Sequence, residues 1–180
     1  MNSASIQNLV EELSSRIPDS RAGLPLELFY FISRLTPMVN VDLFIQNEEG
    51  HTLLVWRDDP FYKGWHMAGG IIRFKELAAD RIKAVAAGEL GATVTSDPNP
   101  MAIHEKMNRE RDIRGHFIAL LYRCDLTSSL DEARRCRNPE SPAHGEWKWH
   151  SCCPDNLLRA HEVYRPLFAT RLEAARVSQE

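Results

Sequence analysis

Hydrophobic residues near the N-terminus recur at the spacing of a helix. One face of a helix over residues 6–17 would carry Ile6, Leu9, Val10, Leu13 and Ile17. A second helix is expected over residues 24–35, because Pro25 would fall in the first turn, where its missing N–H costs nothing. We therefore expect residues 1–35 to form a helical extension packed on the core of one further domain, residues 36–180.

After Pro37 the hydrophobic period changes to two, which indicates β-strands. A β-hairpin is expected from strands at 39–45 and 51–56. One strand over 65–73, broken by two glycines, should lead into a helix over 75–90 that Gly91 ends as a left-handed cap. The remaining expected elements are strands at 101–107, 116–124 and 146–150, followed by helices at 154–161 and 163–177. Strands on either side of one central helix indicate an α+β or mixed α/β sandwich.

Composition and charge narrow the class of protein. The 180 residues, 43% hydrophobic and 26% charged, fit a single globular domain. A net charge of -3 is too balanced for a domain that holds nucleic acid through its phosphates, so no nucleic-acid partner is expected. No apolar run is long enough for a membrane span, and glutamates stand where an export signal would be basic or apolar. Four cysteines without a C-x-x-C pair indicate reduced thiols, and we expect a cytoplasmic protein.

The candidate chemistry lies around the central helix. Gly70 and Glu76 form a G-x5-E pattern, and Glu89 and Gly91 follow at a fixed distance. This spacing resembles the box of the Nudix hydrolase family, G-x5-E-x7-R-E-U-x-E-E-x-G-U, in which U is aliphatic. The box is degenerate, because the family's arginine and two of its glutamates are replaced by Ala84, Val85 and Gly88.

The flanks of the box resemble one subgroup, the GDP-mannose mannosyl hydrolases, over about residues 36–149. The shared features are a Thr-Pro before a strand that contains Asp42, a Leu-Leu-x-x-Arg ending at Arg57, and His144 followed by acidic, aromatic and basic residues. The subgroup also lacks glutamates at the positions of Val85 and Gly88. The resemblance implies a Nudix-like α/β/α sandwich with a mixed sheet between the box helix and a terminal helix, extended here by N-terminal helices.

The same resemblance implies a metal site in which the carbonyl of Gly69 and the carboxylate of Glu89 hold Mg²⁺ or Mn²⁺. Hard oxygen ligands of this kind suit a cation that neutralises a diphosphate. Gly70, Glu76 and Gly91 would be structural parts of the box, although the arginine partner of Glu76 is absent at Ala84.

The remaining implied site residues would handle the substrate. His144 would be the general base, since imidazole can accept a proton near neutral pH. Arg57 would be catalytic and, with Arg73 and Asp42, would bind the substrate; a guanidinium group suits phosphate oxygens. The other six histidines lack metal-like spacing and are expected to be structural, and the charged segment 105–114 is expected to be a solvated face.

These features imply hydrolysis of a nucleoside diphosphate sugar resembling GDP-mannose, with metal-assisted attack of water at the sugar C1. Val85 leaves at most one box-helix carboxylate for the metal, which disfavours the alternative of pyrophosphate cleavage in another nucleoside diphosphate derivative. A second alternative is a nucleotide-sugar-binding domain without catalysis, because Ala84 and Ala143 replace the family's arginine and the subgroup's metal-binding glutamine. The identity of the sugar and base, and a homodimer through the terminal helices, stay open.

Overall fold

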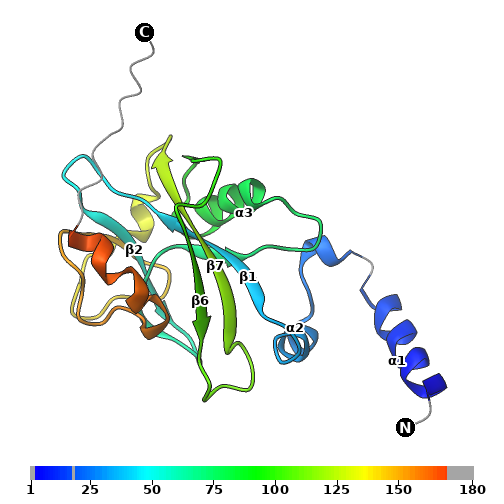
Figure 1. Cartoon of the computed structure of the whole chain (residues 1–180). Helices are drawn as coiled ribbons and strands as arrows, with labels where there is room; N and C mark the ends of the chain where they lie inside the picture. Colours follow the sequence, from blue (N-terminus) through cyan, green and yellow to red (C-terminus); the bar gives the residue numbers. More distant parts are fainter. Residues whose placement is uncertain (1–2, 18, 170–180) are drawn as a thin grey trace.

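The computed structural model describes residues 3–17 and 19–169 of the chain. These residues form two β-sheets with helical segments around them (Figure 1). In chain order the elements are α1 (Ser3–Ser15), η1 (Ser20–Ala22), α2 (Leu26–Ile32), β1 (Met38–Phe44), β2 (Thr52–Asp58), β3 (Lys63–His66), β4 (Gly69–Ile71), α3 (Ala78–Val85), η2 (Ala86–Leu90), β5 (Val94–Ser96), β6 (Ala102–Met107), β7 (His116–Leu126), η3 (Glu132–Arg134), β8 (Trp147–His150) and η4 (Arg159–Ala169). The segments η1, η3 and η4 are 3-10 helices, and η2 is a π-helical turn.

Strand β1 lies inside a mixed five-stranded sheet. It pairs with β7 in parallel and with β4 in antiparallel orientation, and β5 and β6 both pair with β7. Strand β2 is the middle strand of a second, antiparallel sheet between β3 and β8. The register of β1 and β4 sets Asp42 opposite Gly69, so the main sheet brings two of the candidate site residues together.

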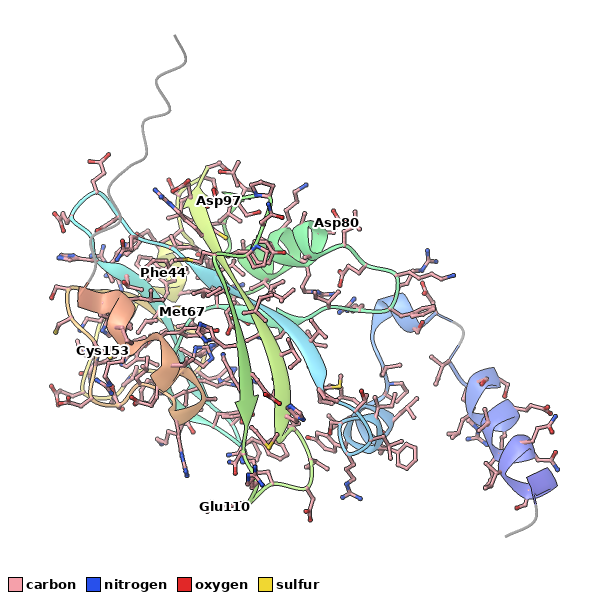
Figure 2. All side chains as sticks on the ribbon, in the orientation of Figure 1. Phe44, Met67, Asp80, Asp97, Glu110 and Cys153 are labelled. Carbon is pink, nitrogen blue, oxygen red and sulfur yellow. The ribbon has the colours of Figure 1, made fainter. Side chains whose placement is uncertain are left out.

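Both faces of β1 are buried, which places the main sheet between two layers. Val41 belongs to a core that it shares with Val85 of α3. Phe44 and Met67, both labelled in Figure 2, belong to a second core on the other side. Tyr164 of η4 is also part of this core. The expected sandwich, with a mixed sheet between the box helix and a C-terminal helical segment, is confirmed.

Two expected strand assignments are wrong. Residues 39–45 and 51–56 do form strands and are joined near the turn by the bridge between Gln46 and Thr52, but β1 and β2 pair in different sheets. The expected single strand over 65–73 is two strands, β3 and β4, also in different sheets. The chain crosses between the sheets at Met67 and Ala68, both buried. Alternating hydrophobicity fixes which residues are strands but not which strands pair.

The box helix is shorter than the sequence indicates. The segment before it is irregular, with Lys75 in the left-handed region at φ 57°, and α3 begins at Ala78. Its last turn widens into the π-helical turn η2, and Gly91 ends it in the left-handed conformation at φ 60°. The expected glycine cap is therefore confirmed.

The C-terminal segment differs from the expectation. Residues 154–158 form no helix, and η4 is a 3-10 helix that contains Pro166, whose ring is incompatible with the interior of a regular α-helix. The expected helix over 163–177 falls partly on η4 and partly outside the described residues.

The two N-terminal helices behave differently. In α2, the Phe29 and Tyr30 rings are in contact, and Tyr30 packs edge-on against Phe61 of the domain. Helix α1 extends away from the sheets (Figure 1), and its apolar residues Leu9 and Val10 are 56% and 55% exposed. In the described residues no helix is long and apolar enough to cross a membrane, and all four cysteines are free thiols.

Candidate active site

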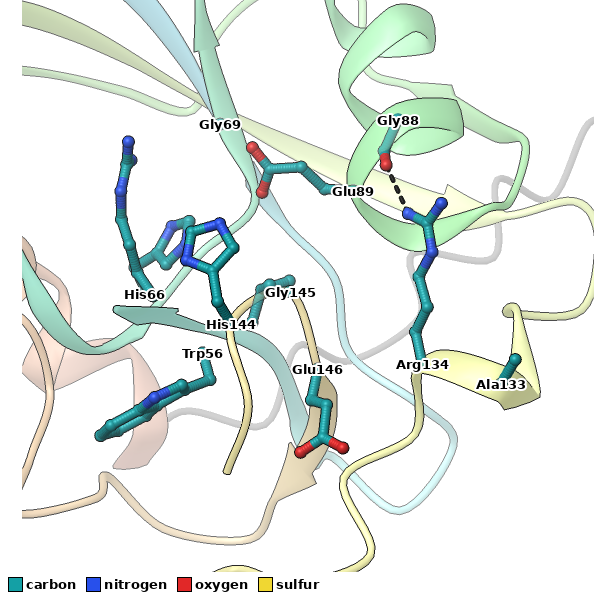
Figure 3. A pocket seen from close by; sticks show the side chains of 12 residues that line it. Trp56, His66, Gly69, Gly88, Glu89, Ala133, Arg134, His144, Gly145 and Glu146 are labelled. Atoms are coloured by element: carbon teal, nitrogen blue, oxygen red, sulfur yellow. Dashed lines mark hydrogen bonds between the residues drawn. The ribbon is translucent and has the colours of Figure 1, made fainter. Parts of the chain in front are cut away.

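A cavity of about 500 Å³ opens where the C-terminal end of the box helix meets β2 and the loop before β8 (Figure 3). The candidate site residues of this region come from segments that are distant from one another in the sequence. The cavity is lined by Val55, Trp56, Arg57, His66, Gly69, Gly88, Glu89, Ala133, Arg134, His144, Gly145 and Glu146. The fold therefore gathers Gly69, Glu89, His144 and Arg57 in one place.

Glu89 extends into this cavity from the π-helical turn η2, toward His144 (Figure 3). Its Oε2 atom is buried and has no hydrogen-bond partner within the part of the chain that the structure describes. Burial raises the pKa of the carboxyl to about 7, against the opposing effects of the Arg57 charge and of a hydrogen bond from the Gly69 backbone. A buried carboxylate oxygen without a donor is a natural ligand for a cation.

The two glycines of β4 permit close packing on both sides of the strand. A Cβ atom at residue 69 would lie 2.5 Å from Oδ1 of Asp42 and 2.8 Å from the carbonyl oxygen of Val41, so β4 approaches β1 too closely for a side chain. A Cβ atom at residue 70 would lie 2.7 Å from Cγ2 of Val85. The residue that replaces a family glutamate is thus packed against the box glycine, which explains why an apolar side chain suits position 85.

Glu76 keeps an arginine partner despite the alanine at position 84. Arg81, one turn earlier on the same helix, donates to the Glu76 carboxylate from Nε at 2.9 Å and from its terminal nitrogen at 2.8 Å. The Glu76 carboxylate also accepts a hydrogen bond from the backbone N–H of Arg73 at 2.8 Å. The expected loss of this ion pair is wrong, because a helix residue three positions away reaches the same carboxylate.

Segment η3 closes the C-terminal end of the box helix. Gly91 lies so close to Asp131 that a Cβ atom would meet the Asp131 Cβ at 2.5 Å, and the N–H of Asp131 donates to the carbonyl of Leu90 at 3.0 Å. Arg134 donates to the carbonyl oxygen of Gly88 in the widened turn (Figure 3). These contacts hold η2 in place and bring Arg134, which the sequence argument missed, to the cavity wall.

His144 lies against the backbone of Asp58 through its Nδ1 atom. In one tautomer the Asp58 N–H donates to Nδ1 at 3.0 Å, and in the other a protonated Nδ1 donates to the Asp58 carbonyl oxygen at 3.1 Å. The loop that carries it is fixed to β2, because the N–H of Gly145 donates to the carbonyl of Trp56 and the N–H of Trp56 donates to the carbonyl of Glu146. Nε2 is therefore the ring nitrogen left for the cavity.

Arg57 lies between two cavities. Its Nε donates to Oδ2 of Asp59 at 2.5 Å, and its guanidinium lies 5.1 Å from the centre of the Tyr62 ring. The second cavity, of about 230 Å³, shares Arg57, His66 and Gly69 with the first. Arg57 can thus contact a substrate that extends through both.

Asp42 faces the second cavity, where it is already engaged. The residue is 2% exposed. Oδ2 accepts hydrogen bonds from Lys106 and from the Tyr164 hydroxyl at 2.5 Å each, and Oδ1 accepts one from Asn40 at 2.7 Å. Burial and the Asp42 carboxylate raise the pKa of the Tyr164 hydroxyl far above its ordinary value. Tyr164 is therefore protonated and donates to Asp42, and η4 closes this end of the cavity.

His66, which was expected to be structural, lines both cavities. Burial, and next the Arg57 charge, lower its pKa to about 3, so the ring is neutral near pH 7. Its Nδ1 lies 2.7 Å from the carbonyl oxygen of Met67 and must donate to it. Nε2 then carries no proton and can accept a hydrogen bond, for example from a substrate hydroxyl.

Arg73 is not brought to either cavity. Its terminal nitrogen donates to the carbonyl oxygen of Arg21 at 2.9 Å, and its guanidinium lies beside Gly23 in the N-terminal extension. Among the described residues, Arg73 therefore connects the extension to the box loop and takes no part in lining the site.

The donors present allow a weak, hard-cation site. Across residues 3–17 and 19–169 no group of three or more His, Cys, Asp or Glu side chains is arranged to hold a metal ion. The unpartnered oxygen of Glu89 is nevertheless a suitable single carboxylate ligand, and Mg²⁺ commonly binds through one or two carboxylates, water and substrate phosphates. The side chains fit a substrate-assisted Mg²⁺ better than a preformed metal cluster.

Comparison with known proteins identifies the fold. No family model matches the sequence, and no curated protein matches it. A possible asymmetric diadenosine tetraphosphate hydrolase from Jonesia denitrificans is similar in structure, with a TM-score of 0.56, 19% sequence identity, and coverage of 77% of this chain and 98% of that chain. A MutT NUDIX hydrolase from Burkholderia pseudomallei gives a TM-score of 0.57 at 17% identity, over 77% of this chain and 99% of that one. An ADP-ribose pyrophosphatase from Streptococcus suis gives a TM-score of 0.53 at 19% identity, over 79% of this chain and 95% of that one.

The chain has the Nudix hydrolase fold. The aligned structures are covered almost completely, so the similarity spans their whole domain. At this level of identity the likeness establishes the fold, and the chemistry has to be argued from the side chains in the cavity.

Proposed function

We propose that the protein is a metal-assisted hydrolase of a nucleoside diphosphate derivative, and specifically of a nucleoside diphosphate sugar of the GDP-mannose type. The observation that carries this proposal is the buried, unpartnered Oε2 atom of Glu89, which faces a cavity that also contains His144 and Arg57. A cation ligand, a base and an anion-binding group are the three parts that such a hydrolysis needs.

Glu89 and the Gly69 backbone are the groups that would hold a Mg²⁺ ion, together with oxygens of the diphosphate. The bound ion would neutralise the diphosphate and so make it a better leaving group. Because Val85 is packed against Gly70, position 85 supplies no second carboxylate. Nudix sites that cleave a pyrophosphate use more than one carboxylate to hold metal ions. A site with a single carboxylate therefore favours attack of water at the sugar C1 over attack at phosphorus.

His144 would remove a proton from the attacking water. When Nδ1 carries the ring proton and donates to the Asp58 carbonyl, the lone pair of Nε2 is free to accept that proton. Arg57 would bind the diphosphate, with Asp59 fixing Nε so that the terminal nitrogens keep their orientation. His66 would accept a hydrogen bond from a hydroxyl group of the bound substrate. Bond cleavage between C1 and oxygen would then release a free sugar and an intact nucleoside diphosphate.

Pyrophosphate cleavage is the second candidate. It is favoured by two of the structural neighbours, an ADP-ribose pyrophosphatase and a possible diadenosine tetraphosphate hydrolase. It would release a nucleoside monophosphate and a sugar phosphate. A third candidate, binding without turnover, is favoured by Ala143, which supplies no metal ligand beside His144.

Turnover in ¹⁸O-labelled water separates these candidates. A panel of nucleoside diphosphate sugars is incubated with Mg²⁺ or Mn²⁺, and products are analysed by mass spectrometry. Label in the free sugar is the expected result. Label in a phosphate-containing product would establish pyrophosphate cleavage and contradict attack at C1.

A Glu89→Gln variant is the matched control for contaminating hydrolase activity, since the amide keeps the size of the side chain and loses its charge. Product formation should fall with the variant. Tight binding of a sugar nucleotide by the native protein, without any product over the pH range 6–9, would establish the binding domain instead.

A further inference from the structure

Three arginine side chains surround the ring of Tyr62. The guanidinium carbons of Arg111, Arg57 and Arg114 lie 4.6, 5.1 and 5.2 Å from the ring centre. Two of them come from the loop between β6 and β7, which the charge pattern had suggested would be a solvated face. Arg111 and Arg114 are instead half-buried and turn inward.

The loop that carries these two arginines has a fixed shape. The N–H of Asn108 donates to the carbonyl of Gly115 at 2.7 Å, and a Cβ atom at Gly115 would lie 2.5 Å from the carbonyl oxygen of Arg111. The N–H of Arg114 donates to the hydroxyl of Ser33 in the segment after α2, at 3.1 Å. Arg111 donates to the carbonyl oxygen of Phe61. The backbone of the loop and the guanidinium group of Arg111 are therefore held in position.

The positive charge of this cluster is only partly balanced. Asp59 accepts a hydrogen bond from Arg57, and within the described part of the chain it is the one carboxylate that forms an ion pair with any of the three guanidinium groups. Nε of Arg114 is buried and has no hydrogen-bond partner among residues 3–17 and 19–169. Burial lowers the pKa of Arg114, and the nearby Arg57 charge acts in the same direction, whereas Tyr62 and Asp59 oppose it. A buried cationic group with an unused donor is costly unless an anion completes it.

The cluster adjoins the candidate active site. Arg57 and Arg114 both line the second cavity, and Arg57 also lines the first, beside Glu89 and His144. Arg111 and Arg114 line a third cavity, of about 930 Å³, which shares Tyr62 and Arg114 with the second. A ligand whose diphosphate contacts Arg57 could therefore place another group at Arg114 without leaving the cavity system.

We propose that the arginine cluster around Tyr62 is a second anion subsite, which binds a phosphate monoester or a carboxylate that the substrate carries in addition to its diphosphate. This inference rests on the proposed function for the identity of the diphosphate at Arg57. Guanidinium groups bind both kinds of oxyanion through paired N–H donors, and stacking on an aromatic ring fixes their planes. The preferred substrate is then a nucleoside diphosphate derivative with an additional negative charge on its nucleoside or on its sugar.

Matched ligand pairs test the subsite by binding alone. Calorimetric titration in EDTA compares ADP-ribose with its 2′-phosphate, which adds a phosphate on the nucleoside, and UDP-glucose with UDP-glucuronate, which adds a carboxylate on the sugar. The native protein is expected to bind the anionic member of one pair at least tenfold more tightly. The pair that shows the preference identifies the source of the anion.

Arg114→Met and Arg114→Gln should reduce that preference to less than threefold while leaving the affinity for the member without the additional anionic group within twofold. Arg123→Met, on β7 and outside these cavities, is the control of equal charge and should keep the full preference. Circular dichroism checks that each variant is folded.

Equal affinities within both pairs for the native protein would overturn the proposal, even if neither Arg114 variant folds. A preference that survives in folded Arg114 variants would also overturn it and would leave the cluster as aromatic packing. Turnover is measured separately: a charge preference without hydrolysis would contradict only the proposed function, and hydrolysis without a charge preference would contradict only the subsite.

Discussion

Glu76 and Arg81 form a two-point ion pair across the turn that leads into the box helix, with N···O distances of 2.8 and 2.9 Å. Both side chains are largely buried, at 18% and 11% exposure. Burial opposes ionisation of Glu76 and raises its pKa. A hydrogen bond from the Arg73 backbone and the pairing with Arg81 act in the opposite direction, and the net result is a pKa below the ordinary value. The pair fixes the loop before α3, and through it the position of β4 relative to the helix.

Arg81→Met should therefore destabilise the protein by about 2–4 kcal/mol, because it leaves a buried carboxylate without its partner. Arg16→Met removes the helical pair with Glu12, whose side chains are 72% and 59% exposed, and should cost less than about 1 kcal/mol. Urea denaturation of the three proteins measures both differences. Equal losses for the two variants would show that the Glu76 pair has no special structural role.

Gly70→Ala should destabilise the fold, because the new Cβ atom would lie 2.7 Å from Cγ2 of Val85. We expect a cost of about 1–3 kcal/mol from this overpacking. Adding Val85→Ala should recover part of it, so the double variant should lose less than the two single losses combined. Gly88→Ala is the control: nothing lies within 4 Å of its Cβ position, and it should be neutral or stabilising by up to about 1 kcal/mol.

Glu89 should make the stability of the metal-free protein depend on pH. Its pKa is about 7 in the folded protein and 4.5 in the unfolded reference, so folding favours the protonated form. The favourable contribution is complete below pH 4.5 and is lost as the pH rises through 7. Relative to Glu89→Gln, which does not ionise, the native protein should lose on the order of 3 kcal/mol between pH 4.5 and pH 8.

Denaturation of both proteins in EDTA at several pH values measures this difference and removes the contributions of the buried histidines, which the two proteins share. A difference that does not change with pH would contradict a buried, unpartnered Glu89 carboxylate. Addition of Mg²⁺ at pH 8 should stabilise the native protein more than the variant.

His144→Gln should lower turnover by roughly 10²- to 10⁴-fold and leave substrate binding nearly unchanged, as expected for loss of a positioned base. His51→Gln is the matched control, because His51 pairs with Glu49 in the turn before β2 and lines neither cavity. Steady-state kinetics on the sugar nucleotide found active supply kcat and KM for both variants. Full turnover by His144→Gln would assign the base to another group, with His66 as the next nitrogen in the cavity.

The linear order of residues determines the local structure of this protein. Alternating or short continuous apolar segments mark β1, β2, β6, β7 and β8. The G-x5-E spacing with its following glutamate and glycine marks the box helix and its left-handed cap at Gly91. Local signals of this kind depend on neighbours within a few residues, and such neighbours are visible in a sequence.

Tertiary structure decided which strands pair, which side chains form ion pairs and which residues line the cavities. Strand pairing placed β1 and β2 in different sheets, since two strands with the same alternation can pair with many partners. Arg81 forms the ion pair with Glu76 that the family pattern assigns to position 84, because the Arg81 side chain is long enough to contact the Glu76 carboxylate from the next turn of the helix. His66 and Arg114 became candidate site residues through their burial beside Arg57, and Arg73 was directed toward the N-terminal extension. Burial, cavity shape and unpaired donors arise only when the chain is folded, so these roles could not be read from residue types and spacing.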